Sequence, residues 1–115
     1  MNERTHSWET PKDFAEKLLN LDREERRKLL REYPPNLTGI GSLMGFTKIE
    51  IDEDGHASFY CKAEEFHYNP IGSVHGGLAA TLLDSCNSIS AQCNLDKGFI
   101  AVSYTHLRAH ETGCY

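Results

Sequence analysis

Apolar residues near the start of the chain recur every three or four positions, as they do on one face of a helix. The apolar positions of this face are Phe14, Leu18 and Leu21. Thr10 and Pro11 come before them and predict a helix that begins at Pro11, because threonine is a good N-cap and proline suits the first helical position. We therefore expect an N-terminal helical extension, which we place over residues 1–35.

A second helix start is indicated inside this extension. Asp22 is followed three residues later by Glu25, which is the spacing of a capping box, so the extension holds either one helix or two short ones. Charges of both signs fill residues 23–28 at helical spacing, and this pattern is typical of a solvated helix face rather than a binding patch. Pro34 and Pro35 predict the end of the helical region.

The period of the pattern changes to two after Leu43. The first alternating set is Thr47, Ile49 and Ile51, and the second is Ala57, Phe59, Cys61 and Ala63. Asp54-Gly55 lies between the two sets and predicts a tight turn, since glycine readily adopts positive φ. Residues 43–63 are therefore predicted to form a β-hairpin with one buried face.

The chain after Gly77 is apolar almost all round a helical circumference, unlike an amphipathic surface helix. This pattern predicts a buried central helix that ends near Asn94. The apolar run 99–102 then predicts the beginning of another strand. Helices and strands together predict an α+β fold.

Composition limits the class of protein. A chain of 115 residues is expected to form one domain, and a net charge of −5 provides no basic surface for nucleic acid. No apolar run approaches the roughly 20 residues that cross a membrane, and the polar N-terminus lacks a signal peptide, so we expect a cytoplasmic location. The cysteines have no metal-ligand spacing, and we expect reduced thiols without a metal site.

The segment from residue 66 to residue 84 contains the candidate catalytic residues. Gly76 and Gly77 open the central helix, where free N–H groups and the helix dipole favour a developing oxyanion. Asp84 lies inside the apolar run, where a carboxylate is costly without a partner or a function. These are the components of an acyl-transfer site.

The order and spacing of these residues resemble the hotdog-fold thioesterases, specifically the phenylacetate-pathway or PaaI-type group. The matching positions are Asn69, Gly72, His75, Gly76, Gly77 and Asp84. The resemblance covers residues 36–102 and implies an antiparallel sheet wrapped around the central helix. Since only two clear strands and the start of a third are present, we expect this hotdog domain to be incomplete at its C-terminal side.

The resemblance also implies a role for each matching residue. The Gly76 N–H would donate to the thioester carbonyl, and Asp84 would act as general base or as nucleophile. Asn69 would orient water or the thioester, and His75 would fix the turn at the helix start. Two further glycines would contact the substrate, namely Gly72 and Gly77. The implied substrate is an acyl-CoA with a medium-chain or aryl-acetyl group, and no cofactor is implied.

Helix geometry adds a constraint on this site. Eight residues separate Gly76 from Asp84, which is about 12 Å of helix rise, so one chain cannot bring both to the same carbonyl. If both take part, they come from different subunits. We therefore expect a homodimer or homotetramer in which antiparallel central helices bring Asp84 of one subunit to Gly76 of the other.

Simpler interpretations remain open for each residue. The glycines would then only open the helix, Asp84 would be a hydrogen-bonded core or interface residue, and Asn69 would only form a turn. At the level of function, the alternatives are a non-catalytic acyl-binding hotdog protein, a hydroxyacyl-thioester dehydratase and an inactive fragment of a thioesterase.

The last residues, 103–115, do not continue the strand alternation. Their order resembles a translated sequencing adapter that recurs on unrelated chains. We therefore expect this tail not to be native, and we assign no function to it.

Overall fold

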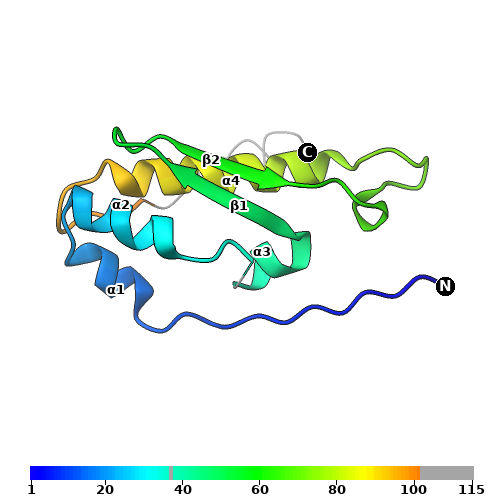
Figure 1. The fold of residues 1–115 in the computed structure, drawn as a ribbon, viewed down its shortest axis with the longest axis horizontal. Coiled ribbons are helices and arrows are strands. Elements are labelled where there is room, and N and C mark those ends of the chain that lie inside the picture. Colours follow the sequence, from blue (N-terminus) through cyan, green and yellow to red (C-terminus); the bar gives the residue numbers. More distant parts are fainter. Residues whose placement is uncertain (37, 102–115) are drawn as a thin grey trace, which may run out of the picture.

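A computed structural model describes residues 1–36 and 38–101. Its elements are the helices α1 (Phe14–Leu19), α2 (Arg23–Glu32), α3 (Gly39–Met44) and α4 (Gly76–Cys93), the strands β1 (Phe46–Ile51) and β2 (Ala57–Cys61), and one 3₁₀ turn (Glu65–His67). In Figure 1 the two strands cross one side of the long helix α4, and α1 and α2 lie beside its C-terminal end. This mixture of helices and a small antiparallel sheet is compatible with part of a hotdog fold. The expected non-native tail and Val102 lie outside the described residues.

The predicted β-hairpin is confirmed. β1 and β2 pair in antiparallel register, with Ile49 opposite Phe59, and Gly55 in the connecting turn has φ 81°. Residues of β2 alternate between half-buried and exposed, as the sequence pattern predicts. An irregularity at the start of β1 buries Phe46 and exposes Thr47, so the prediction that Thr47 belongs to the buried face is wrong.

The extension contains two short helices, and the predicted start of the first is wrong. α1 begins at Phe14, after Asp13 in the left-handed conformation with φ 55°. The residues before it run as an extended arm that contacts the body of the protein through Arg4 and Ser7. The Arg4 guanidinium donates to the carbonyls of Ser42 and Leu43 at 2.9 and 2.6 Å.

The capping box of α2 is confirmed. The Asp22 carboxylate accepts the N–H of Glu25 at 2.9 Å, and the Glu25 carboxylate accepts the N–H of Asp22 at 3.2 Å. We expect Asp22→Ala to lower the free energy of unfolding by about 1 kcal/mol in urea titrations, because a backbone donor loses its acceptor. Glu24→Ala removes a charge from the same turn without removing a cap, so an equal loss in both variants would contradict this account.

The predicted charged face on α2 is exposed over most of residues 23–28, but the prediction is wrong for Arg26. Arg26 is fully buried, and its guanidinium donates to the carbonyls of Leu21, Gln92, Asp96 and Phe99 at distances from 2.5 to 3.3 Å. These carbonyls include one in the last turn of α4 and two in the chain that follows it, where a cation is favoured by the helix dipole. A buried arginine thereby fastens the extension to the C-terminal end of α4.

Helix α4 ends at Cys93 with Asn94 as its C-cap, as predicted, but the prediction that it is a buried central helix is wrong for the described part of the chain. Its buried residues are Leu78, Gln92 and Cys93, whereas Leu83 is 62% exposed. The cause is that the sheet within residues 1–36 and 38–101 consists of the two hairpin strands, which cover one side of the helix. The opposite side of the helix carries apolar residues that meet solvent.

The expected strand after α4 is also not formed over its described residues, Phe99 to Ala101. The side-chain amide of Gln92 takes the place of a neighbouring strand, because its Nε2 donates to the Ala101 carbonyl at 2.9 Å and its Oε1 accepts the Ala101 N–H at 3.2 Å. The paired backbone groups are thus satisfied without a sheet.

Two further features of the described residues relate to the sequence analysis. Cys61, Cys86 and Cys93 are not joined by disulfides within this part of the chain. None of the helices in this part of the chain combines the length and the apolar character that a membrane crossing requires.

Candidate functional site

The loop before α4 is held by Asn69. Tyr68 and Val74 form an isolated antiparallel bridge that closes the loop, and Gly72 turns it with φ 83°. The Asn69 Oδ1 accepts the N–H groups of Ile71 and Ser73, each at 3.1 Å, and its Nδ2 donates to the Ser73 Oγ at 2.9 Å. Asn69 therefore shapes its own loop, and one hydrogen of its amide remains for a ligand.

His75 begins the helix. It is the N-cap of α4, and its Nδ1 accepts the N–H of Gly77 at 2.8 Å. A neutral imidazole that accepts at Nδ1 carries its proton on Nε2, so this ring offers a donor rather than a free basic nitrogen. This geometry does not favour the dehydratase alternative, which requires a catalytic histidine base.

Gly76 offers an unused donor at the same point. Among residues 1–36 and 38–101, no acceptor lies within hydrogen-bond distance of its N–H, and the residue is exposed. A Cβ placed on Gly76 would meet nothing within 4 Å. The backbone N–H is therefore open to an incoming ligand at the positive end of an 18-residue helix.

Asp84 lies two turns further along the same face of α4. Gly76, Ala80 and Asp84 are spaced by four residues, so they share one side of the helix, and Gly76 and Ala80 are exposed while Asp84 is half-buried. The unbroken helix keeps Gly76 and Asp84 about 12 Å apart along its axis. One chain therefore brings Asn69, His75, Gly76 and Gly77 together and leaves Asp84 apart from them.

Comparisons with known proteins found relatives that share one name. The chain is similar to acyl-coenzyme A thioesterases. Over 42 residues it is 45% identical to acyl-coenzyme A thioesterase 13 of Mus musculus, and the proteins of that name from Pongo abelii and Homo sapiens match with the same identity and length. The matched stretch spans 36% of this chain and 29% of the length of each relative.

No family model matches the chain, and no solved structure matches it. The similarity to the three thioesterases supports thioester hydrolysis in general terms only, because it covers 42 residues.

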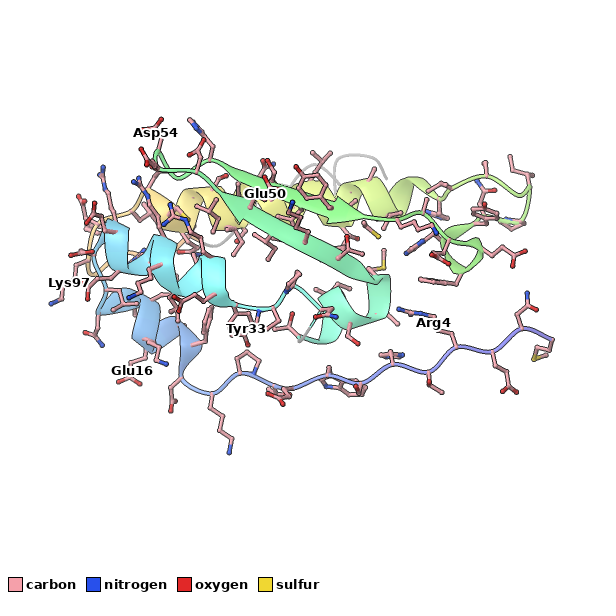
Figure 2. The ribbon with its side chains drawn as sticks, in the orientation of Figure 1. Arg4, Glu16, Tyr33, Glu50, Asp54 and Lys97 are labelled. Atoms are coloured by element: carbon pink, nitrogen blue, oxygen red, sulfur yellow. The ribbon has the colours of Figure 1, made fainter. Side chains whose placement is uncertain are left out.

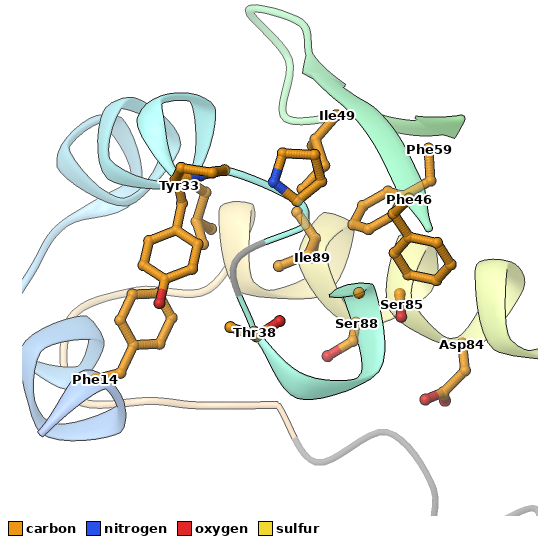
Figure 3. Close-up of a pocket in the computed structure, with 14 residues that line it drawn as sticks. Phe14, Tyr33, Thr38, Phe46, Ile49, Phe59, Asp84, Ser85, Ser88 and Ile89 are labelled. Atoms are coloured by element: carbon orange, nitrogen blue, oxygen red, sulfur yellow. The ribbon is translucent and has the colours of Figure 1, made fainter. Parts of the chain in front are cut away.

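An apolar pocket of about 240 Å³ lies between α4, the hairpin and the N-terminal extension. Asp84, Ser85 and Ser88 of α4 contribute polar groups to its lining, and aromatic rings form much of the rest. Figure 3 shows Asp84 at one end of this pocket, with Ser85 and Ser88 following along the helix. A pocket of apolar walls with a few polar groups is the usual form of a small-molecule site.

A second cavity, of about 590 Å³, lies at the N-terminal end of α4. Its lining includes His75, Gly77 and Phe66, together with Arg4 and His6 of the N-terminal arm. Figure 2 shows Arg4 reaching from the arm toward the body of the protein, where its guanidinium lies 3.9 Å from the centre of the Phe66 ring. The arm thus forms part of the wall of the cavity that lies beside the first residues of α4.

His67 is a buried histidine in the segment before the site. It is 6% exposed, its Nε2 lies 2.6 Å from the Met44 carbonyl, and its Nδ1 accepts the N–H of Glu64 at 2.9 Å. His67 is buried by the capping interactions of a single 3₁₀ turn. Such a short turn has no periodic pattern in the sequence from which it could be predicted. His67 therefore ties the loop before the site to α3.

The Cys61 thiol lies 3.9 Å from the His67 Nε2, which raises the question of a nucleophilic pair. Burial raises the pKa of the Cys61 thiol, whereas a cysteine nucleophile needs a lowered pKa. Both His67 nitrogens are also engaged with backbone groups. The pair is therefore structural.

One group of potential metal ligands occurs in the described residues, formed by Asp52, Asp54 and His56 in the hairpin turn. Asp52 Oδ1 accepts the N–H groups of Asp54 and His56, each at 2.9 Å, so this carboxylate already serves the turn. The cluster is exposed and does not belong to the site at the start of α4.

Proposed function

We propose that this chain hydrolyses thioesters as a dimer with two equivalent active sites, each of which combines residues from both copies of the chain. We propose further that its substrate is an acyl-CoA with a medium-chain or aryl-acetyl group. The observation that carries the proposal is one side of α4 on which the exposed Gly76 and Ala80 are followed by the half-buried Asp84. An oxyanion donor and a carboxylate on one side of a helix, two turns apart, suit a site shared between two antiparallel helices.

The register of such a dimer follows from symmetry. If two copies of α4 lie antiparallel and Asp84 of each meets the partner's Gly76, the two-fold axis passes beside Ala80, midway between them. Ala79 and Ala80 are small and exposed, which permits two helix backbones to approach closely. The exposed Leu83 would be covered in the same contact, which accounts for an apolar side chain left in water by the single chain.

The proposed chemistry is hydrolysis of a thioester to a carboxylic acid and a free thiol. The Gly76 N–H donates to the carbonyl oxygen, which becomes negative as the tetrahedral intermediate forms. Asp84 of the opposing chain either removes a proton from the attacking water or attacks the carbonyl itself to form an anhydride that water then opens. In both routes the electron pair of the C–S bond leaves with sulfur. His75 fixes the conformation of the helix start. Asn69 shapes the neighbouring loop and donates its remaining amide hydrogen to the water or to the thioester. Gly72 and Gly77 leave room for the substrate.

The direct test is release of free thiol from a panel of acyl-CoAs. We expect turnover by the chain and a fall of about 100- to 10,000-fold in kcat for Asp84→Ala, since general-base catalysis contributes this range. Glu24→Ala removes an exposed carboxylate of α2, outside the proposed helix contact, and serves as the control. Equal activity of Asp84→Ala and the unmodified chain would contradict the proposal, and acyl-CoA binding without turnover would favour the acyl-binding alternative.

A further inference from the structure

The apolar pocket beside Asp84 has a wall that belongs to the N-terminal extension. Resting on the proposed function, we propose that Phe14 and Tyr33 of this extension close the far end of the acyl pocket and thereby set the longest acyl group that the site accepts. The extension would then be a determinant of substrate specificity as well as a structural support.

The two ends of the pocket differ in chemistry. At one end α4 supplies the Asp84 carboxylate and the Ser85 hydroxyl, where a polar thioester group is tolerated. At the other end Phe14 and Tyr33 pack with their ring centres 5.1 Å apart. Figure 3 places this aromatic pair and Asp84 at opposite sides of the pocket. A substrate with its carbonyl at Asp84 would therefore direct its apolar group toward Phe14 and Tyr33.

The side walls between these ends are apolar and well fixed. Phe46 and Phe59 of the hairpin meet edge to face with ring centres 5.8 Å apart, and Ile49 and Ile89 also line the pocket. Phe14 itself packs against the buried cluster formed by Leu18, Leu30, Ile51 and Cys93. Because Phe14 is packed against the core, its ring cannot shift easily to make room for a longer acyl chain.

The dimensions favour a short occupant. The pocket has a volume of about 240 Å³, below the roughly 300–1,000 Å³ of most ligand pockets. From Asp84 to Ile89 it follows α4 for five residues, about 7.5 Å of helix rise. A single aromatic ring or a short alkyl chain suits this space, which narrows the proposed acyl group toward the aryl-acetyl and shorter members.

The test changes the size of the end wall in both directions. We expect Phe14→Ala to raise the ratio of kcat/KM for long acyl-CoAs to that for short ones by at least about 10-fold, since each methylene in an apolar pocket is worth 10- to 200-fold. Phe14→Trp is expected to move the ratio the other way. Tyr60→Ala removes an exposed ring from the same hairpin but outside the pocket lining and is expected to leave the ratio unchanged.

A binding measurement separates this inference from the proposed hydrolysis. Titration calorimetry with the same acyl-CoA panel is carried out on Asp84→Asn, alone and combined with each Phe14 variant, after circular dichroism has established that the variants fold. A shift of the preferred chain length without turnover in any variant would support the pocket and contradict hydrolysis. Turnover with the same length preference in Phe14→Ala, Phe14→Trp and the unmodified chain would overturn the inference alone, and absence of both binding and turnover would overturn both.

Discussion

Co-expression of Asp84→Ala and Gly76→Pro chains is expected to restore about a quarter of the wild-type thioesterase activity, although each variant alone is nearly inactive. In a random mixture half of the dimers contain one chain of each kind. In such a dimer one site combines an intact Gly76 with an intact Asp84, and the other site lacks both. A site contained within one chain would give no recovery, because every chain would carry one defect.

Gly76→Pro is the suitable change because it deletes one donor and preserves the helix. Gly76 is the first residue of α4, a position where proline is favoured and its missing N–H breaks no intrahelical bond. His75 before it is extended, with ψ 134°, which suits the residue preceding a proline. Loss of one oxyanion donor is expected to lower kcat by about 100- to 1,000-fold.

Gly76→Ala is the matched control for this substitution. It adds a side chain at the same position but keeps the N–H, and its Cβ meets nothing within 4 Å in the chain. We expect Gly76→Ala to retain most of the activity measured by thiol release. If Gly76→Pro is as active as Gly76→Ala, the Gly76 N–H does not stabilise the oxyanion.

The largest loss of stability is expected from Arg26→Ala. The Arg26 side chain is fully buried, and its removal leaves up to four carbonyl oxygens without their donor and an unfilled space between α2 and α4. Unsatisfied buried polar groups cost about 1–3 kcal/mol each, so we expect the free energy of unfolding in urea to fall by more than about 3 kcal/mol.

Arg23→Ala provides the comparison on the same helix. Arg23 forms an exposed ion pair with Asp96 at 3.0 Å, and such pairs contribute about 0–1 kcal/mol. Arg26→Lys keeps the charge but cannot reach several carbonyls at once, so it should also be destabilising. Similar unfolding midpoints for Arg23→Ala and Arg26→Ala would show that the buried contacts contribute little.

The sequence by itself determined the features that depend on near neighbours. The capping box at Asp22, the hairpin turn at Gly55 and the start and end of α4 are local, because each is decided by hydrogen bonds or backbone preferences within a few residues. The same holds for the group of site residues from Asn69 to Gly77, which are close in the chain and therefore close in space. Their spacing to Asp84 along a continuous helix followed from helix geometry alone.

Only the tertiary structure decided which charged and apolar groups are covered. Arg26 lies in a run that is typical of a solvated face, yet it is buried because the carbonyls of Gln92, Asp96 and Phe99, which are 66 to 73 residues away in the sequence, converge on it. Leu83 belongs to an apolar helix but is exposed, since burial depends on which elements are present to pack against it. The pocket between Asp84 and Phe14 has the same origin, because it joins residues 70 positions apart, and no local pattern encodes that contact.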